Sequence, residues 1–540
     1  MASISKKSSV GAIKAGTQCM NTDVRLGQSL KGNIVANYLG QIWRALMAIA
    51  FVPVYIKYLG IESYGLIGIF ALLQAWLGLL DIGMKPALSR EMARFTGGAH
   101  NTQSIRDLLR SIEIVAIAIA ALAAISLAAA SGWLAADWVK GENLPKETVT
   151  RAFAVMSVVT GLRFIEDIYV SCIVGLQRQV FQNIVSSMLA ALRGFGAVGI
   201  LILISPTIEA FFAWQGLVSL ITVIVFASAI HRALPKSLRP ARFSLPALQN
   251  VWRFAAGMMT ITFLALLLTQ VDKILLSRLL TLKAFGYYSF AVLVASGLSL
   301  ITGPIAAAFY PRFTALVTRG DDCALSANYH LAAQLVTTLT GTIAIFLIFF
   351  GDVVLLLWTK DVGLTQEVAP LMRVLVLGTL LNALMWIPYH LQLAHGWTAL
   401  TIRTNIVAVG ILVPAILLIV PVQGAIGAAW IWVALNTGYL SVSIFFMHQR
   451  LLPTEKWRWY VQDLILPLGI ATATAELCRL LIPQGLGELG EFIVLLLVGG
   501  CILASAAVSA AMLRKQLVRH LQKFISQIIS RKLPVWHPPG

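Results

Sequence analysis

The sequence is dominated by segments of about 20 residues that are apolar and almost free of charge. The stretch from Tyr64 to Leu80, for example, contains no charged residue. An α-helix of this length crosses the hydrocarbon core of a bilayer and satisfies its backbone hydrogen bonds internally. Fourteen such segments can be recognised between residues 33 and 513. Only 12% of the chain is charged, against about 25% in soluble domains, so we expect an all-α, polytopic membrane protein with about 14 transmembrane helices.

The formal net charge of +18 has two explanations, nucleic-acid binding or the excess of basic residues in cytoplasmic loops of membrane proteins. Of the 41 Lys and Arg residues, 28 fall in the tails and in alternate loops, and six fall in the opposite loops. This alternation favours the second explanation, and no nucleic-acid partner is expected. It predicts a multi-pass protein of a bacterial inner membrane with both termini cytoplasmic.

An internal repeat organises the chain. The segment 57–65 aligns with 278–286 at an offset of 221 residues, and Asn183-Ile184-Val185 aligns with Asn405-Ile406-Val407 at an offset of 222. The offset contains six apolar segments, an even number, so the two halves should be parallel repeats. The predicted organisation is a basic cytoplasmic tail (1–32), a lobe of six transmembrane helices (33–230), a cytoplasmic amphipathic linker (231–253), a second six-helix lobe (254–447), two additional transmembrane helices (448–513) and a basic cytoplasmic tail (514–540).

Several turn and segment-end motifs resemble those of the polysaccharide transporter family, the Wzx-like flippases. They are LGIESYG at 59–65, LLDIG at 79–83, Asp272-Lys273, and the run from Phe285 to Tyr288. The resemblance implies two six-helix lobes around a central cavity that opens alternately to each side. It also implies an undecaprenyl-pyrophosphate-linked oligosaccharide as substrate, moved from the cytoplasmic to the periplasmic leaflet for O-antigen or exopolysaccharide synthesis. Polymerases and glycosyltransferases of the same pathway, and membrane lipids, are the implied partners.

The sequence carries no phosphate-binding loop, HExxH or GxSxG motif, and its five cysteines lack metal-site spacing. We therefore expect a transporter without a cofactor or metal rather than an enzyme, with proton or sodium coupling as a way to drive it. A lipid II flippase and a multidrug/toxin cation antiporter of the same superfamily remain alternatives. A polymerase or ligase is less favoured, because the longest outer loop, about 137–150, is short.

Charged residues within the apolar segments are the candidate site residues, because a charge in a bilayer needs a partner or a watery cavity. Arginine suits a pyrophosphate through its planar fork. We expect a cationic substrate site, with Asp272 and Asp81 as candidates for ion coupling, although each residue can instead form a structural pair; for Arg163 the nearby Glu166 and Asp167 favour such a pair. The candidate substrate-binding residues are Arg44, Arg193, Arg163 and Lys273.

Overall fold

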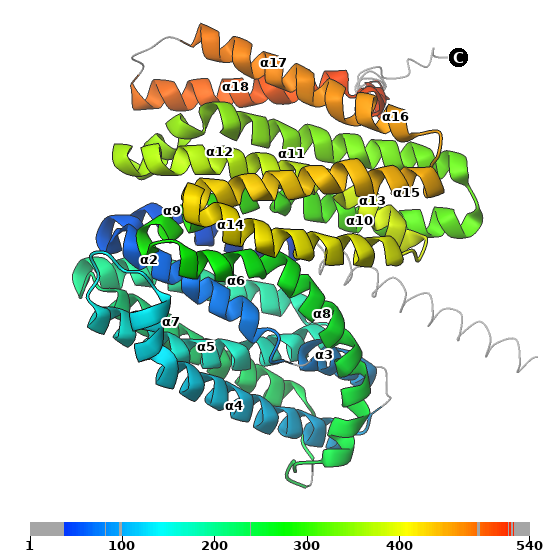
Figure 1. Cartoon of the computed structure of the whole chain (residues 1–540). Coiled ribbons are helices and arrows are strands. Elements are labelled where there is room, and N and C mark those ends of the chain that lie inside the picture. The colour runs from blue at the N-terminus through cyan, green and yellow to red at the C-terminus, as the bar shows by residue number, and fades with distance from the viewer. Residues whose placement is uncertain are drawn as a thin grey trace, which may run out of the picture. The chain divides into compact units, whose positions relative to one another are not determined.

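The computed structural model shows an all-α protein, with no strand among the residues it describes (Figure 1). The predicted tail 1–32 and most of the predicted tail 514–540 lie outside those residues. The described residues form two compact units, which divide between Leu267 and Leu268. The described residues are 37–81, 83–96, 100–237, 239–482, 487–516, 518, 519 and 522.

The first unit is arranged around α5, which packs against α2, α3, α4, α6 and α7. Its apolar core joins α3, α4, α5 and α7 and includes Leu88, Ile112, Phe164 and Phe226. The side chain of Asn101 accepts a hydrogen bond from the Ser104 amide and so caps the start of α4. The elements are a helix at 37–50, α2 (Val52–Leu77), α3 (Met84–Thr96), α4 (Thr102–Trp133), the π-helix η1 (Leu134–Trp138), α5 (Lys146–Gly175), α6 (Gln179–Leu203) and α7 (Ile208–Ala233).

The second unit is arranged around α11, which packs against α10, α12, α17 and α18 (Figure 1). α8 (Leu245–Leu279) begins in the first unit and ends in the second. The other elements are α9 (Leu282–Ser296), α10 (Ser299–Arg319), α11 (Asp322–Thr359), α12 (Val362–Leu384), α13 (Trp386–Ala394), α14 (Ala399–Gly438), η2 (Tyr439–Ser443), α15 (Ile444–Leu451), α16 (Lys456–Arg458), η3 (Trp459–Ile465), α17 (Leu466–Leu481) and α18 (Glu488–Ser509).

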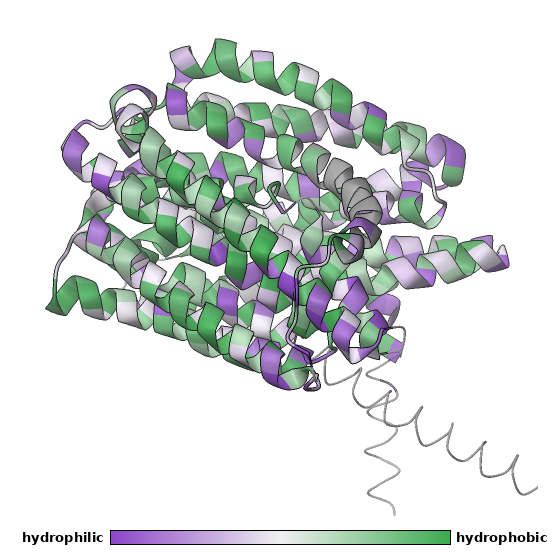
Figure 2. Ribbon diagram, turned by 90° about the horizontal axis from the view of Figure 1, so that it is seen from below, coloured by the Kyte–Doolittle hydropathy of each residue, from purple (hydrophilic) through white to green (hydrophobic). Residues whose placement is uncertain are grey.

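Ten helical stretches in the described part of the chain are long and apolar enough to cross a membrane. Hydrophobic residues cover much of the helices, while many hydrophilic ones gather near helix ends and loops (Figure 2). Some stretches are longer than one span of about 20 residues. The stretch from Ala399 to Leu451, for example, has 53 residues, and its backbone breaks at Gly424. The protein is therefore a multi-pass membrane protein, and the expected count of about 14 spans is compatible with these helices.

The bounds of the helices repeat at the offset read from the sequence. A shift of 221 residues carries α4 onto residues 323–354, within α11, and carries α5 onto 367–396, where α12 and α13 lie. The caps repeat as well, because Asp321 accepts a hydrogen bond from the Ala324 amide at the start of α11, as Asn101 does at the start of α4. The same order of helices thus occurs in both units.

Candidate functional site

Polar side chains of α5 and α7 face one another inside the first unit. Arg163 and Glu166 are three residues apart on α5, and Gln215 and Ser219 are four apart on α7, so each pair lies on one face of its helix. Gln215 and Ser219 are buried. Arg163 bonds to the first of these α7 residues, and Arg193 of α6 bonds to the second. The two arginines therefore occupy neighbouring turns of one polar column.

Arg193 forms the tightest ion pair of this column. One of its terminal nitrogens lies 2.6 Å from Glu166 Oε2 and also donates to Ser219 Oγ at 3.1 Å. The two charged side chains are 20% and 16% exposed, respectively. The Nε atom of Arg193 is buried, and no partner for it is found among the described residues. The pair is thus neutral overall and still has an unused donor.

Arg163 bonds to a neutral amide. Its guanidinium donates to Gln215 Oε1 at 3.1 Å and lies 5.1 Å from the centre of the Phe70 ring. Its Nε is also buried without a partner in the described part of the chain. Glu166, which the sequence favours as the local partner of Arg163, binds Arg193 instead. The reason is that α6 brings a second guanidinium to the same carboxylate.

Asp81 lies in the turn before α3 and belongs to a second charged group, with Lys85 of α3 and Asp167 of α5. Asp81 Oδ1 accepts a hydrogen bond of 2.6 Å from the Gly83 amide, and its other oxygen lies 3.6 Å from Lys85 Nζ. The same Lys85 nitrogen lies 2.9 Å from Asp167 Oδ2. Asp81 therefore accepts a hydrogen bond at a chain turn and shares a lysine with α5.

Arg44 stands apart from this column. Its guanidinium donates to Asn183 Oδ1 of α6 at 3.1 Å, and it forms no ion pair among the described residues. Asn183 is 3% exposed and also donates to the Gln179 carbonyl oxygen. Asn183 and Arg193 are ten residues apart, about 15 Å along the helix axis, so the guanidinium groups of Arg44 and Arg193 lie at two separate positions along α6. Arg44 is partly buried and bonds to a neutral amide, as Arg163 does, but it lies outside the column that contains Arg193 and Glu166.

Lys273 and Asp272 lie on α8 in the second unit. The Lys273 ammonium donates to the Thr269 carbonyl oxygen at 2.7 Å and to Gln270 Oε1 at 3.3 Å, one turn back on its own helix. Asp272 Oδ1 is buried, and the described residues provide it with no hydrogen-bond donor. The structure thus brings Arg163 and Arg193 together and links Asp81 through Lys85 to Asp167 of α5. It gives Arg44 and the α8 residues separate surroundings.

The sequence did not indicate two of the site residues, Asn183 and Gln215. Both are uncharged, so a search for charges within apolar segments passes over them, although both hold a guanidinium. For Asn183 a signal exists, because the triplet that begins with it recurs at Asn405. Chemically, these arrangements offer guanidinium groups with unused donors to an anion, because each arginine carries five N–H donors and no acceptor.

Comparisons with known proteins agree with this arrangement of helices. Residues 30–317 match the family model described as "Polysaccharide biosynthesis protein". A protein of Shigella flexneri named as an O-antigen transporter is 21% identical over 404 residues, covering 75% of this chain and 94% of that protein. These findings confirm the resemblance drawn from the turn motifs.

Two solved structures share the fold. The lipid II flippase MurJ in an inward closed conformation has a TM-score of 0.65 at 13% identity, covering 90% of this chain and 99% of that one. An inward-facing multidrug resistance transporter of the MATE family, within the MOP superfamily, has a TM-score of 0.58 at 15% identity, covering 76% and 96%. The names of these relatives are those of transporters and flippases, which confirms the prediction of a transporter rather than an enzyme. The chain belongs to the polysaccharide biosynthesis protein family and has the helical fold of MOP-superfamily transporters.

Proposed function

We propose that the protein is a flippase for a lipid-linked oligosaccharide of the undecaprenyl-pyrophosphate type. It would move this substrate from the cytoplasmic to the periplasmic leaflet by alternating access, for O-antigen or exopolysaccharide synthesis. The family match over residues 30–317 and the name of the Shigella flexneri relative support this substrate class. The MurJ-like fold supports the mode of action.

The observation that carries the proposal is the environment of Arg44. Its guanidinium is held by the neutral Asn183 amide, and no carboxylate of the described residues pairs with it. A full positive charge within a membrane-spanning unit is costly unless an anion or water compensates it. The planar fork of arginine fits two phosphate oxygens at once. A pyrophosphate group is therefore the anion that we assign to this position.

Arg193 and Arg163 would contact the pyrophosphate after it leaves Arg44. A phosphate that reaches Arg193 competes with Glu166 for the same terminal nitrogen, while the unused Nε donors of both arginines can serve it directly. This competition limits how tightly the substrate binds, because Glu166 pairs with Arg193 again when the phosphate leaves. We assign the transient phosphate position to this column.

The remaining assignments complete the proposal. We place the protein in a bacterial inner membrane with both termini cytoplasmic, and we assign proton or sodium coupling to Asp272, whose Oδ1 is buried without a donor among the described residues. Polymerases and glycosyltransferases of the same pathway would supply and consume the substrate. No cofactor enters this scheme.

The test uses a strain that lacks the gene and follows its lipid-linked oligosaccharide pool by mass spectrometry, together with its surface polysaccharide. We expect the pool to accumulate and wild type to clear it. Each lost charged hydrogen bond costs about 1.5–3 kcal/mol, so Arg44→Ala with Arg193→Ala should reduce clearance about tenfold or more.

Arg479→Ala is the matched control, because Arg479 is 62% exposed and pairs only loosely, at 3.6 Å, with Glu476 on its own helix. It should clear the pool as wild type does. Clearance by the double variant would remove Arg44 and Arg193 from the path. Accumulation of lipid II instead would identify the lipid II flippase, and drug sensitivity with an unchanged pool would identify a multidrug antiporter.

A further inference from the structure

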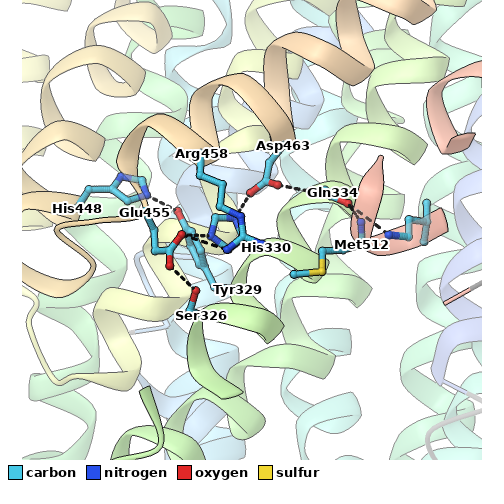
Figure 3. A network of polar contacts seen from close by, with 10 residues as sticks. Ser326, Tyr329, His330, Gln334, His448, Glu455, Arg458, Asp463 and Met512 are labelled. Atoms are coloured by element: carbon cyan, nitrogen blue, oxygen red, sulfur yellow. Dashed lines mark hydrogen bonds and ion pairs between the residues drawn. The ribbon is translucent and has the colours of Figure 1, made fainter. Parts of the chain in front are cut away.

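One face of α11 carries polar residues that bind the C-terminal extension, defined here as residues 452–513. Ser326, His330 and Gln334 follow one another at intervals of four and therefore lie on one face of the helix. Each of them bonds to the extension, through Glu455, Asp463 or the Met512 amide. Figure 3 shows these side chains meeting between α11 and the segments around α16 and η3.

His330 lies at the centre of this network with both ring nitrogens against carboxylates. Its Nδ1 contacts Asp463 Oδ2, and its Nε2 lies 3.0 Å from Glu455 Oε2. The side chains of His330 and Asp463 are fully buried, whereas that of Glu455 is 20% exposed. The partly exposed carboxylate of Glu455 thus contacts the buried imidazole of His330, which in turn contacts the buried carboxylate of Asp463 (Figure 3).

Counting hydrogens shows that the three groups must hold two protons between them. A neutral imidazole has one N–H and one acceptor nitrogen, and an ionised carboxylate can only accept. With a single proton, one of the two contacts would therefore bring two acceptors together in a buried place. Two protons make both contacts hydrogen bonds, either with an imidazolium or with a neutral imidazole and one carboxylic acid.

The surroundings of Glu455 favour its ionised form. Burial acts to raise the pKa of Glu455, but hydrogen bonds from His330 and Ser326 and the charge of Arg458 outweigh it, so this pKa lies below its usual value. Asp463 also accepts a 2.7 Å hydrogen bond from Gln334 Nε2. The other titratable or charged groups near His330 are Tyr329 of α11, His448 of α15, and Lys456 and Arg458 of α16.

The same network holds the far end of the extension. Gln334 donates to Asp463, so its Oε1 is left to accept, and it takes the Met512 amide at 2.8 Å and the Leu513 amide at 3.3 Å. These amides lie in the first turn of the helical residues 511–516, where backbone donors lack partners within the helix. Farther along α11, Ile345 and Phe350 share an apolar cluster with α17 and α18.

We propose that His330, Asp463 and Glu455 form a proton-binding site whose bound proton holds the C-terminal extension on α11. When the proton leaves, the extension loses a hydrogen bond and gains a buried contact between two acceptors. A free imidazole in water loses its proton near about pH 6.5, and in the undocked state neither contact requires the second proton. Above that pH the docked state binds more protons than the undocked one, so docking is stable at low pH and weakens as pH rises.

Hydrogen exchange of the full-length protein in detergent or nanodiscs reports on this docking through the Met512 and Leu513 amides. Exchange rates are corrected for the intrinsic effect of pH and compared between pH 6 and pH 9. For one linked proton, protection should fall by up to about tenfold per pH unit above the pH at which the undocked imidazole deprotonates, until the docked site loses its own proton. Protection that stays constant over this range would overturn the proposal.

The decisive variant is Glu455→Gln. Its amide N–H can donate to an unprotonated His330 Nε2, so the contact no longer needs the second proton, and Arg458, 37% exposed, can turn to water. We expect protection of Met512 and Leu513 to become independent of pH and to exceed that of wild type at pH 9. Loss of protection at every pH would show that the carboxylate charge, not the proton, holds the extension, and would refute the site.

Two controls separate this effect from general ones. Glu476→Gln makes the same chemical change on α17, at a side chain that is 47% exposed, and should keep the pH dependence of wild type. His395→Gln removes a histidine that bonds to the Leu391 carbonyl oxygen of its own helix, and should also keep it. A pH dependence that disappears in His395→Gln would place the titrating group outside the network and contradict the proposal.

Discussion

Arg193 and Glu166 lie 27 residues apart in the sequence, yet their side chains meet at 2.6 Å. Both residues stand out in the sequence, because charges are rare in its apolar segments. Their pairing was not predictable, since three or four residues of spacing favour Arg163 as the partner of Glu166. The choice between the two arginines depends on how α6 packs beside α5, and spacing along one helix contains no information on that packing.

Changing Glu166 tests whether this pair is structural, functional or both. Glu166→Gln leaves Arg193 largely buried beside a neutral group, and breaking a buried pair in this way costs about 3–5 kcal/mol. We expect a lower Tm in thermal unfolding of the purified protein. Adding Arg193→Met should restore part of the Tm, whereas clearance of the lipid-linked pool should stay below that of wild type.

Glu476→Gln is again the comparison, because the pair of Glu476 with Arg479 is exposed. Exposed substitutions usually change stability by no more than about 0.5 kcal/mol. An unchanged Tm in Glu166→Gln would mean that Arg193 finds another partner, and recovery of clearance in the Arg193→Met double variant would exclude a role for the guanidinium in transport.

At the scale of elements, glycines mark two of the positions where the helical backbone breaks. Gly60 lies in the LGIESYG turn motif at 59–65 and has φ 79° and ψ 163°. Gly424 has φ 63° and ψ −149° where the backbone of α14 breaks. The contacts of the polar face of α11 were harder to predict from the sequence, because its partners lie more than 120 residues away in the chain.

Alanine at these glycines should destabilise the turns through the backbone alone. Apart from the adjoining backbone, no atom of the described residues lies within 4 Å of a Cβ built at Gly60 or Gly424, so steric overlap does not contribute. Backbone regions of this kind cost a residue with a side chain about 1–3 kcal/mol. We expect Gly60→Ala and Gly424→Ala to lower the Tm by a few degrees.

Gly132 provides the control for this prediction. It lies in α4 with equally open space at its Cβ position and without a positive φ. Gly132→Ala should leave the Tm unchanged or raise it slightly, because alanine reduces the entropy of the unfolded chain. A similar fall in all three variants would mean that the effect does not come from the backbone angles.

At the scale of the whole molecule, the two units use the same position differently. Asn183 and Asn405 align in the internal repeat, but Asn183 accepts from the Arg44 guanidinium and Asn405 accepts from the Tyr439 hydroxyl at 2.8 Å. The repeat and its helix order were predictable because turn motifs survive in both halves. The difference in partners was not, because Arg44 and Tyr439 do not occupy matching positions.

The matched substitution Asn183→Asp and Asn405→Asp tests this asymmetry. An aspartate at 183 neutralises Arg44 and keeps its hydrogen bond, while it loses the Nδ2 donor that serves the Gln179 carbonyl oxygen. We expect about tenfold slower clearance of the lipid-linked pool. Aspartate at 405 meets a neutral hydroxyl and should leave clearance close to wild type. Equal clearance by both variants would contradict the assignment of the pyrophosphate to Arg44.

The network on α11 also has a consequence for synthesis of the protein. Asp463 follows His330 by 133 residues in the chain, and ribosomes add about 5–20 residues per second. For about 7–27 s, each newly made α11 therefore exposes a histidine and a glutamine whose partners do not yet exist. A nascent chain stalled before Asp463 should be a preferred substrate for membrane chaperones and proteases, and quality control could sense completion of the C-terminal helices through this one face.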